Sequence, residues 1–354
     1  MIEAEVQIGK FTYNLDDILD SLIHVRGFNL CSSYCIFEIS HSMPEIVFEF
    51  MNYSTIKFRY SINSNDSGWI EMAVLMPKSD ISLSHVKSKV IAIEKGFVNL
   101  SSKQNIKAFP KQSISDVIKN LASNANISYD IKDTRGVYTY LQTNMTDLQF
   151  IVQYLQPLAI TSSNESPYLF TIDKNKLIFK PAELKQEPFK SYPLISNIET
   201  VIKKLTVYNR GSMADYMSGT RNVSYGYDPI NLGLLIKELS MTNTEPESLN
   251  NILYNSMYSR TNILPYSEKW MVEAHSRFLL GMSKFIVGAY AIVEGDIDYN
   301  PGQINEFKIP HLSGDIGEYS GKYFTSDVIN IIKRNSFMSH LKLVGNAFYQ
   351  GEQV

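Results

Sequence analysis

Residues 109–118 mark a change of hydrophobic period in the chain and read Phe109-Pro110-Lys111-Gln112-Ser113-Ile114-Ser115-Asp116-Val117-Ile118. Ser113 to Asp116 match a capping box, in which the serine hydroxyl accepts from a backbone N–H and the acid favours the positive helix end. Apolar residues then recur at helical spacing, at Ile114, Val117, Ile118, Leu121, Ala122 and Ala125. We therefore predict that a helix begins at Ser113, after a strand-rich segment.

A second helix and a hairpin follow within the same region. Thr146-Asp147-Leu148-Gln149 forms another capping box, and the apolar residues after it share one helical face until Pro157 ends the helix. Residues 168–172 and 176–179 alternate as strands around the turn Asp173-Lys174-Asn175. Residues 106–182 are accordingly predicted to form an α+β unit.

The chain before this unit, residues 1–105, is predicted to be mainly β with one helix. Asn14 is a plausible N-cap, and Leu15, Ile18, Leu19, Leu22 and Ile23 follow it at helical spacing. Short apolar or alternating runs between polar turns predict strands at 35–39, 46–50, 56–60, 70–75, 89–93 and 96–100.

The chain after this unit divides into two regions. Residues 183–265 mix strands at 202–208 and 221–227 with polar loops, and Asp228-Pro229 marks a turn. Residues 266–354 begin with a helix over 268–280 and continue with strands at 285–293, 306–309, 323–332 and 339–345.

Composition narrows the class of protein. The 354 residues include 44% hydrophobic and 19% charged residues, with 22 Tyr and 18 Phe and a net charge of −3. This balance excludes a disordered chain and a dedicated nucleic-acid binder, which would carry a strongly basic domain. The acidic start Met1-Ile2-Glu3-Ala4-Glu5 lacks the features of a signal peptide, and no apolar run is long enough for a membrane helix. We expect a soluble protein that does not insert into membranes.

The order of these elements resembles the baseplate hub proteins of contractile phage tails, including the T-even phage hub, the late control protein D family and the N-terminal half of VgrG spike proteins. The resemblance is carried by short segments along nearly the whole chain. They are residues 109–118, 141–151, 177–181, 296–302, 321–329 and 339–343. Asn330 is a departure, because the family often has His at that place in its C-terminal strand.

The resemblance implies a mainly β fold with an α+β insertion and two tube-like β-barrel domains. The first barrel would span residues 1–105, completed by part of 183–230, and the second 266–354, with the insertion at 106–182 and a connecting region at 183–265. Three chains would form a pseudo-sixfold ring that joins the sixfold tail tube to the threefold central spike. The implied partners are two further copies of the chain, a tube or tube-initiator protein, a spike protein and the tape measure protein, with DNA only in transit.

Two patterns suggest metal sites, and each has a plainer interpretation. Cys31 and Cys35 are spaced as a pair, but only His24 and His41 lie near them in sequence, so buried thiols are favoured over zinc. Asp296, Asp298 and Asn300 alternate as in a calcium loop, but Pro301 and Phe307 occupy the places of the required Gly and Glu. A turn at Asn300-Pro301-Gly302 is the favoured interpretation.

Catalytic signatures are lacking in the sequence. His275, His311 and His340 are isolated from any nucleophile motif, and the acid pairs Asp16/Asp17 and Glu245/Glu247 carry no specific spacing. We therefore expect no catalytic, cofactor-binding or metal-binding residues and no enzyme activity. The alternatives are a tail-associated enzyme that degrades cell walls and a hub or spike component of a bacterial contractile injection system.

A run of lysines lies between residues 85 and 111, where Glu94 is the single acid. The lysines are Lys87, Lys89, Lys95, Lys103, Lys107 and Lys111. One interpretation is a basic surface that binds DNA or an acidic partner. The other is that these lysines lie on solvent-exposed strand faces, where they prevent pairing with other strands. The second interpretation is favoured.

Overall fold

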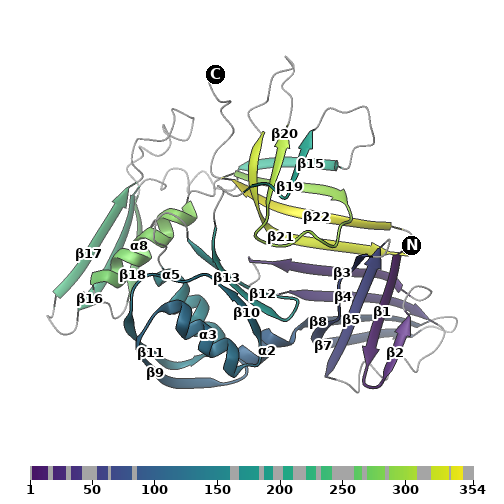
Figure 1. The fold of residues 1–354 in the computed structure, drawn as a ribbon, viewed down its shortest axis with the longest axis horizontal. Helices are drawn as coiled ribbons and strands as arrows, with labels where there is room; N and C mark the ends of the chain where they lie inside the picture. Colours follow the sequence, from purple (N-terminus) through teal and green to yellow (C-terminus); the bar gives the residue numbers. More distant parts are fainter. Residues whose placement is uncertain are drawn as a thin grey trace, which may run out of the picture.

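The computed structural model describes residues 2–14, 19–28, 33–41, 54–62, 65–81, 86–159, 167–182, 187–193, 202–209, 221–228, 233–240, 259–264, 269–283, 287–308, 320–334 and 336–345. Strands dominate these residues, and the mainly β fold with an α+β insertion is confirmed (Figure 1). No helix in the described ranges is long and apolar enough to cross a membrane.

A large sheet begins with the N-terminal strands. They are β1 (Ile2–Ile8), β2 (Phe11–Asn14), β3 (Leu19–Gly27), β4 (Tyr34–His41), β5 (Thr55–Ile62), β6 (Asn65–Asp66), β7 (Ile70–Ile81) and β8 (Val86–Glu94). In β5, Ile56, Phe58 and Tyr60 are buried and alternate with Lys57 and Arg59. This period of two places one apolar face on the core, which the same face of β1 and β4 completes.

The C-terminal strands continue the same sheet. They are β14 (Lys190–Pro193), β15 (Ile202–Asn209), β19 (Val287–Glu294), β20 (Ile304–Lys308), β21 (Gly321–Lys333) and β22 (Ser336–Gly345). The main path runs β15-β19-β22-β21-β3-β4-β8-β7-β5-β1-β2, so that the antiparallel pair β21–β3 joins the two parts of the sheet. Among the described strands, β15 and β2 end this path.

Gly27 allows β3 and β21 to approach each other closely where the two parts of the sheet join. It lies opposite Asp327 in the β3–β21 register. A Cβ at position 27 would lie 2.1 Å from Asp327 Oδ1 and 2.8 Å from the Ser326 carbonyl oxygen. Any larger residue would therefore have to displace β21 or the aspartate.

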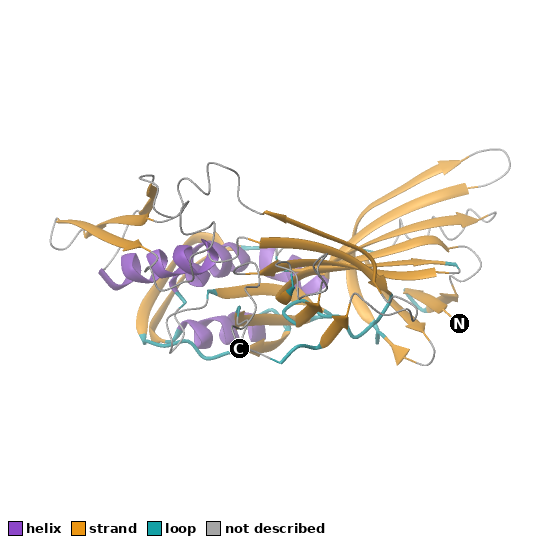
Figure 2. Ribbon diagram, turned by 90° about the horizontal axis from the view of Figure 1, so that it is seen from above, coloured by secondary structure: helices purple, strands orange, loops and turns teal. Residues whose placement is uncertain are grey.

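The insertion follows β8. Its elements are α2 (Lys95–Ser101), β9 (Gln104–Gln112), α3 (Ile114–Asn124), β10 (Ser128–Ile131), β11 (Tyr138–Thr146), α4 (Asp147–Gln149), the π-helical turn η1 (Phe150–Leu155), α5 (Gln156–Leu158), β12 (Tyr168–Asp173) and β13 (Lys176–Pro181). β10, β13 and β12 form one small sheet, and β9 and β11 form a two-stranded ribbon. Seen from above, the strands near the N-terminus fan out at one end, and the helices gather toward the other (Figure 2).

Both predicted capping boxes begin helices. The Ser113 hydroxyl accepts from the Asp116 backbone N–H, and Thr146 and Gln149 form the full reciprocal box. Val117, Ile118, Leu121 and other apolar residues of α3 are buried in the core of the insertion. The second helix passes through η1, and Pro157 lies in its last turn, one residue before its end.

The predicted hairpin is confirmed as β12 and β13. Lys174 and Asn175 connect the strands with φ angles of 50° and 59°. Positive φ at both positions is typical of a type I′ turn, whose twist matches that of the flanking strands.

A fourth sheet contacts the helix α8 (Lys269–Ser283), which in turn contacts the insertion. β17 (Gly233–Ser240), β16 (Arg221–Asp228) and β18 (Ser259–Leu264) form this sheet, and α8 lies alongside (Figure 1). Trp270 of α8 stacks on Tyr138 of β11, with ring centroids 3.8 Å apart.

Two predicted elements are wrong. The helix expected from Asn14 to Ile23 is instead the end of β2 and the start of β3, on either side of residues outside the described part. Because β3 lies between β4 and β21 and is buried on both faces, its apolar residues do not alternate, and they also fit a helical spacing. The strand expected at 96–100 is helix α2, whose buried Gly96 and Leu100 are spaced by one helical turn.

The remaining predicted strands are confirmed within three residues at their ends, except that β7 continues six residues past the predicted end at Leu75, and the helix over 268–280 is confirmed as α8. The predicted strand at 46–50 and Pro229 of the predicted turn lie outside the described residues.

Candidate functional site

A sealed cluster of charged residues lies where the insertion meets both parts of the large sheet. Arg26 on β3 is completely buried, although Arg is a residue that is seldom fully buried. Its Nη1 donates to Asn300 Oδ1 at 2.9 Å and lies 3.4 Å from Asp173 Oδ2, and Nη2 donates to the Tyr299 carbonyl. One guanidinium therefore ties β3 to the turn of the insertion hairpin and to the loop after β19.

Glu94 holds the same hairpin turn from the other side. It ends β8, is completely buried, and accepts from the backbone N–H groups of Lys174 at 2.7 Å and Asn175 at 3.1 Å, one on each carboxylate oxygen. Burial, followed by the nearby Asp173 carboxylate, raises the pKa of Glu94 to about 8. The carboxyl group of the folded chain therefore mostly retains its proton at neutral pH.

His24 extends the cluster across the sheet through hydrogen bonds. Its Nε2 lies 2.9 Å from Ser33 Oγ, and its Nδ1 lies 3.3 Å from the Tyr60 hydroxyl. Asn330 Nδ2 donates to that hydroxyl at 2.9 Å, and Ser339 Oγ donates to Asn330 Oδ1 at 2.8 Å. Burial and then the cationic neighbours Arg26 and Lys174 hold the pKa of His24 well below its usual value, so the ring is neutral.

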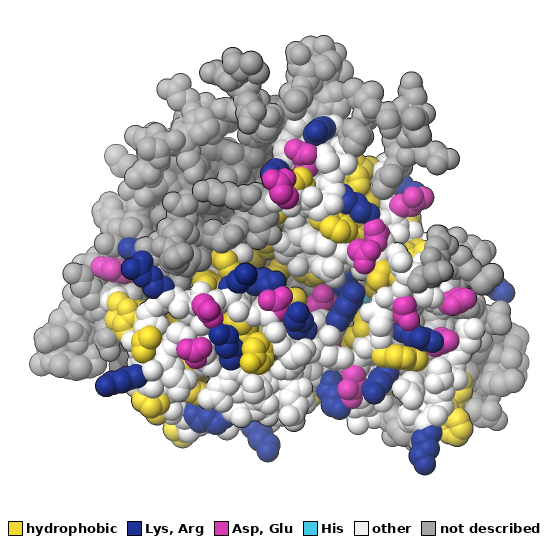
Figure 3. All heavy atoms as spheres, viewed as in Figure 1, with side chains coloured by type: hydrophobic (Ala, Val, Ile, Leu, Met, Phe, Trp, Pro, Cys, Tyr) yellow, Lys and Arg dark blue, Asp and Glu magenta, His cyan; other side chains and the backbone are white. Residues whose placement is uncertain are grey.

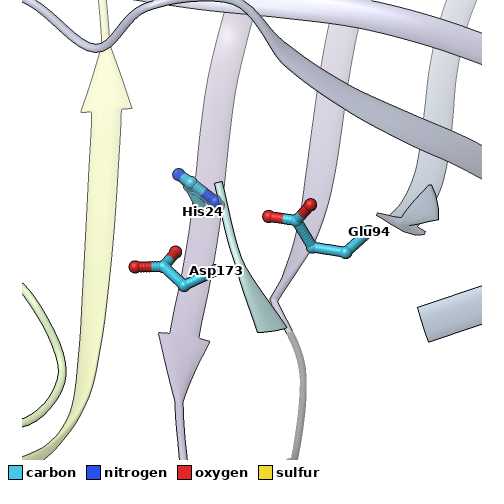
Figure 4. Close-up of side chains that lie close together, drawn as sticks. All are labelled: His24, Glu94 and Asp173. Atoms are coloured by element: carbon cyan, nitrogen blue, oxygen red, sulfur yellow. The ribbon is translucent and has the colours of Figure 1, made fainter. Parts of the chain in front are cut away.

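The ligand atoms of His24, Glu94 and Asp173 lie within 4.8 Å of one another, as three metal ligands would (Figure 4). A metal ion does not fit this arrangement. Both histidine nitrogens and both Glu94 oxygens already have partners within the protein. The Arg26 guanidinium lies beside Asp173 and supplies the positive charge that a metal would bring. We therefore interpret the cluster as a buried structural link that reaches neither solvent nor substrate.

Of Cys31 and Cys35, only Cys35 belongs to the described residues, and it is a buried free thiol on β4, as the favoured interpretation expects. Burial raises its pKa well above the usual value, which disfavours the thiolate that zinc requires. Cys31 and the side chain of His41 lie outside the described part. His24 belongs to the charged cluster instead.

The acidic loop after β19 is a turn with internal partners. Asp296 Oδ1 accepts from the Asp298 backbone N–H, and its Oδ2 pairs with Lys190. Asn300 Oδ1 faces Arg26, and Gly302 adopts a φ of 93° in the predicted turn. Asp296 and Asn300 thus direct side-chain oxygens that a calcium ion would need to donors of the protein.

The isolated histidines stay isolated in the described structure. His275 is half-buried on α8, and His340 on β22 contacts the Tyr290 hydroxyl; burial lowers the pKa of both. Neither contacts a carboxylate among the described residues. His311, Asp16, Asp17, Glu245 and Glu247 lie outside those residues.

The lysine run divides into two groups. Lys89 pairs with Glu38 at 3.6 Å, and Lys95 pairs with Glu71 at 2.6 Å. Lys87 is exposed on β8. Lys107 and Lys111 lie on the ribbon strand β9, and Lys103 directly precedes it. None of these four forms an ion pair with a described residue.

The sequence did not point to Arg26, and it placed Asp173 only in the turn of a hairpin. The available signal was a pair of polar residues, His24 and Arg26, inside an otherwise apolar run. Assigning that run to a helix concealed the signal, because only a strand places residues two apart on one face.

No family model and no curated protein matches the sequence, but several solved structures are similar to this one. A tail protein from Neisseria meningitidis is similar over 98% of each chain, with a TM-score of 0.69 and 10% identity. A prophage tail protein from Shewanella oneidensis covers 97% of this chain and 98% of its own, with a TM-score of 0.67 and 12% identity.

A component of the type VI secretion system of Escherichia coli, which is itself structurally similar to bacteriophage T4 tail proteins, is also similar. It covers 98% of this chain and 79% of its own, with a TM-score of 0.55 and 8% identity. This chain therefore has the fold of phage tail proteins and of their type VI secretion counterparts.

Proposed function

We propose that this chain is a structural hub subunit of a contractile phage tail baseplate. The observation that supports this most is the likeness to a phage tail protein across 98% of both chains. A match over the full length means that the large sheet, the insertion and their mutual arrangement are all shared, and not only one common domain.

The active form in this proposal is a homotrimer with two tube-like barrels per chain. The first barrel is built on residues 1–105, with part of 183–230, and the second on 266–354. The insertion is 106–182, and 183–265 connects the parts. Three chains then form a pseudo-sixfold ring between the sixfold tail tube and the threefold spike.

Two features of the sheet support such a ring. β2 and β15 end the ladder among the described strands, and exposed strand edges are normally covered or paired in native proteins. A closed ring of subunits gives each edge a neighbour. The partners are a tube or tube-initiator protein, the spike and the tape measure protein, and the chain resides in the virion after assembly in the host cytoplasm.

The proposed role is mechanical and not catalytic. The cluster around Arg26 suits it, because this cluster joins the insertion to both parts of the sheet and is closed to substrates. A turbidity assay on peptidoglycan suspensions tests the alternative of a cell-wall-degrading enzyme, and a loss of turbidity would contradict the structural role.

Negative-stain electron microscopy of the purified protein tests the assembly. The proposal expects a threefold ring with a central hole. Compact monomer-sized particles, unchanged when the spike protein is added, would overturn it.

A hub of a bacterial contractile injection system is a second candidate, favoured by the type VI secretion likeness. It differs in biological setting and not in fold. Immunogold labelling separates the two candidates, since a phage hub locates to free virions and an injection-system hub to cell-associated particles.

A further inference from the structure

The large sheet has a second face, opposite the one that carries the buried cluster and packs on the cores. Along β1 and β5 this outer face is polar, as the solvated face of an antiparallel sheet normally is. Glu5 lies opposite Arg59 there, and Gln7 lies opposite Lys57. Along β3, β4, β8 and β21 the same face becomes apolar. It carries six isoleucines, which we call the isoleucine band: Ile23, Ile36, Ile91, Ile93, Ile329 and Ile331.

The strand register places the isoleucine band in two adjacent rows. The first row runs from β21 to β8 through Ile331, Ile23, Ile36 and Ile91. The second row runs through Ile329, Val25, Tyr34 and Ile93. Met338 of β22 continues the first row, and His340 of β22 and Ile292 of β19 continue the second.

The isoleucine band contributes to none of the four hydrophobic cores that the described residues form. Its six side chains are half-buried. Val25, which lies between them, is 4% exposed and is likewise outside those cores. Packing in the described cores therefore does not explain why this stretch is apolar. An apolar stretch beside a polar one on the same sheet face is typical of an interaction surface.

Lysines stand on both borders of the band and on the same face. Lys333 follows Ile331 by two residues on β21, and Lys342 lies two residues beyond the second row on β22. Residues two apart in a strand share a face. Lys204 on β15 lies opposite Ile292. None of these three lysines forms an ion pair with a described residue.

The acids of this part of the face are mostly engaged. Glu38 accepts from the Ser21 hydroxyl at 2.7 Å and pairs with Lys89 at 3.6 Å. Asp327 is completely buried and accepts from a neighbouring hydroxyl. Glu294 is exposed at the end of β19. Many other lysines have acidic neighbours, and basic and acidic side chains lie side by side across the middle of the view in Figure 3. The borders of the band thus carry a surplus of positive charge.

The dimensions of the band fit one α-helix laid across the strands. From β8 to β19 the band crosses six strands, so it is about 24 Å long, and its two rows are about 7 Å apart. A helix about 10 Å wide covers two such rows, and about 16 residues of helix span the length. The backbone groups of these strands are already paired in the ladder, so a partner is recognised through side chains and does not add as a strand.

Other occupants fit this face less well. A second copy in a twofold contact would bring lysines together, because Lys333 and Lys342 stand on opposite borders. Insertion into a bilayer needs apolar side chains that protrude, and those of the band are half-buried. A nucleic acid would pair with the lysines but leave the isoleucines uncovered.

We propose that the isoleucine band binds an amphipathic α-helix of a different protein, with an apolar stripe flanked by acids. The stripe covers the isoleucines, and the acids pair with Lys333 and Lys342 on the two borders. This inference concerns the single chain and does not rest on the proposed ring.

Fluorescence anisotropy with the purified full-length chain tests the proposal. The probe is a fluorescein-labelled peptide of about 16 residues, in which leucines at helical spacing form one stripe, glutamates flank it and alanines fill the rest. One comparison peptide has lysine in place of glutamate, and another has the same composition with the leucines dispersed around the helix. We expect the glutamate-flanked helix to bind at least about tenfold more tightly than either, and less tightly as salt is added.

A charge reversal tests the borders of the band. Lys333→Glu with Lys342→Glu should weaken binding of the glutamate-flanked helix about tenfold and strengthen binding of the lysine-flanked one. The matched control is Lys57→Glu with Lys107→Glu, which also reverses one exposed and one half-buried lysine without an ion pair to a described residue. The control should bind both peptides as the unaltered chain does.

A second variant tests the apolar rows. Ile36→Thr with Ile331→Thr keeps β-branched residues in the strands and should weaken binding of the glutamate-flanked helix about tenfold. The matched control is Ile62→Thr with Ile131→Thr, which changes half-buried strand residues outside the band and should leave binding unchanged. Melting followed by circular dichroism establishes that each variant is folded, and the charge reversal tests the site without altering its apolar rows.

Four outcomes would overturn the proposal. The first is no binding of the glutamate-flanked helix, or equal losses in the variants and their controls. The second is a charge reversal that leaves the preference between the two peptides unchanged. The third is binding to phosphatidylglycerol vesicles that Ile36→Thr with Ile331→Thr abolishes, which would assign the face to a membrane. The fourth is self-association in light scattering that the same variant abolishes, which would assign it to a second copy of the chain.

Discussion

At the scale of single residues, Glu94 makes stability depend on pH. Its folded pKa is about 8, against 4.5 for an ordinary glutamate. Between these values the unfolded chain has released the proton and the folded chain retains it, so the free energy of unfolding falls as pH rises. The slope approaches about 1.4 kcal/mol per pH unit for one proton. We expect Glu94→Gln to show a shallower decline than the unaltered chain in urea titrations.

The measurement belongs between about pH 6.5 and 8. Below this window, the lowered pKa of His24 adds an opposite slope, because the unfolded histidine takes up a proton that the buried one refuses. Glu294→Gln, at the exposed end of β19, is the control. Parallel curves of unfolding free energy against pH for the unaltered chain and Glu94→Gln would disprove the raised pKa of Glu94.

Gly27 gives a second prediction for a single residue. Gly27→Ala would bring a Cβ within 2.1 Å of Asp327 Oδ1 and should destabilise the chain by about 1–3 kcal/mol, as overpacking does. Gly345→Ala is the control, since its Cβ would meet the Tyr323 ring at an ordinary 3.4 Å. Equal urea midpoints for the two variants would contradict the close approach of β3 and β21.

Several of these residues stand out in the sequence for other reasons. His24 lies near Cys31 and Cys35, Glu94 is the single acid among lysines, and Asn330 departs from a family pattern. Their meeting in one buried cluster depends on strand pairings between distant segments. No local spacing encodes such pairings.

At the scale of elements, α3 holds the insertion together through its apolar face. Leu121 is completely buried in that core. Leu121→Asp would bury a charge without a partner, so we expect the insertion to unfold. Thermal melting followed by circular dichroism, together with assembly followed by size-exclusion chromatography, measures the effect. Asn120→Asp, on the exposed side of the same helix, is the control, and normal melting and assembly of Leu121→Asp would defeat the prediction.

The sequence predicted an element correctly where the residues that determine it lie within a few positions of one another. The serine and threonine caps and the alternation around Lys174 and Asn175 act within a few residues, so α3, α4 and the hairpin were predicted from sequence. β3 was missed because a strand buried on both faces loses its alternation. Residues 96–100 were wrongly predicted as a strand. Gly96 is a weak helix former, but in α2 its missing side chain leaves room for Ile127 and Ile172 to pack against the helix.

At the scale of the whole molecule, we expect the cluster around Arg26 to make the insertion and the sheet unfold together. The strand order that places β21 against β3 follows from long-range pairing, and the resemblance to tail hubs anticipated the general architecture but not this junction. Because Arg26 contacts the hairpin turn at Asp173 and the loop at Asn300, it connects units that otherwise have separate cores.

Arg26→Ala tests this connection. The substitution leaves Asp173 buried beside Glu94 without its cation, and breaking a buried pair in this way typically costs about 3–5 kcal/mol. We expect the unaltered chain to unfold in one calorimetric transition and the Arg26→Ala variant in two, one for the insertion and one for the sheet. Arg26→Met combined with Asp173→Asn removes both charges and should recover most of the lost stability, because no charge is then left unpaired. If the single variant lost stability but still melted in one transition, the cluster would stabilise the fold without coupling its parts.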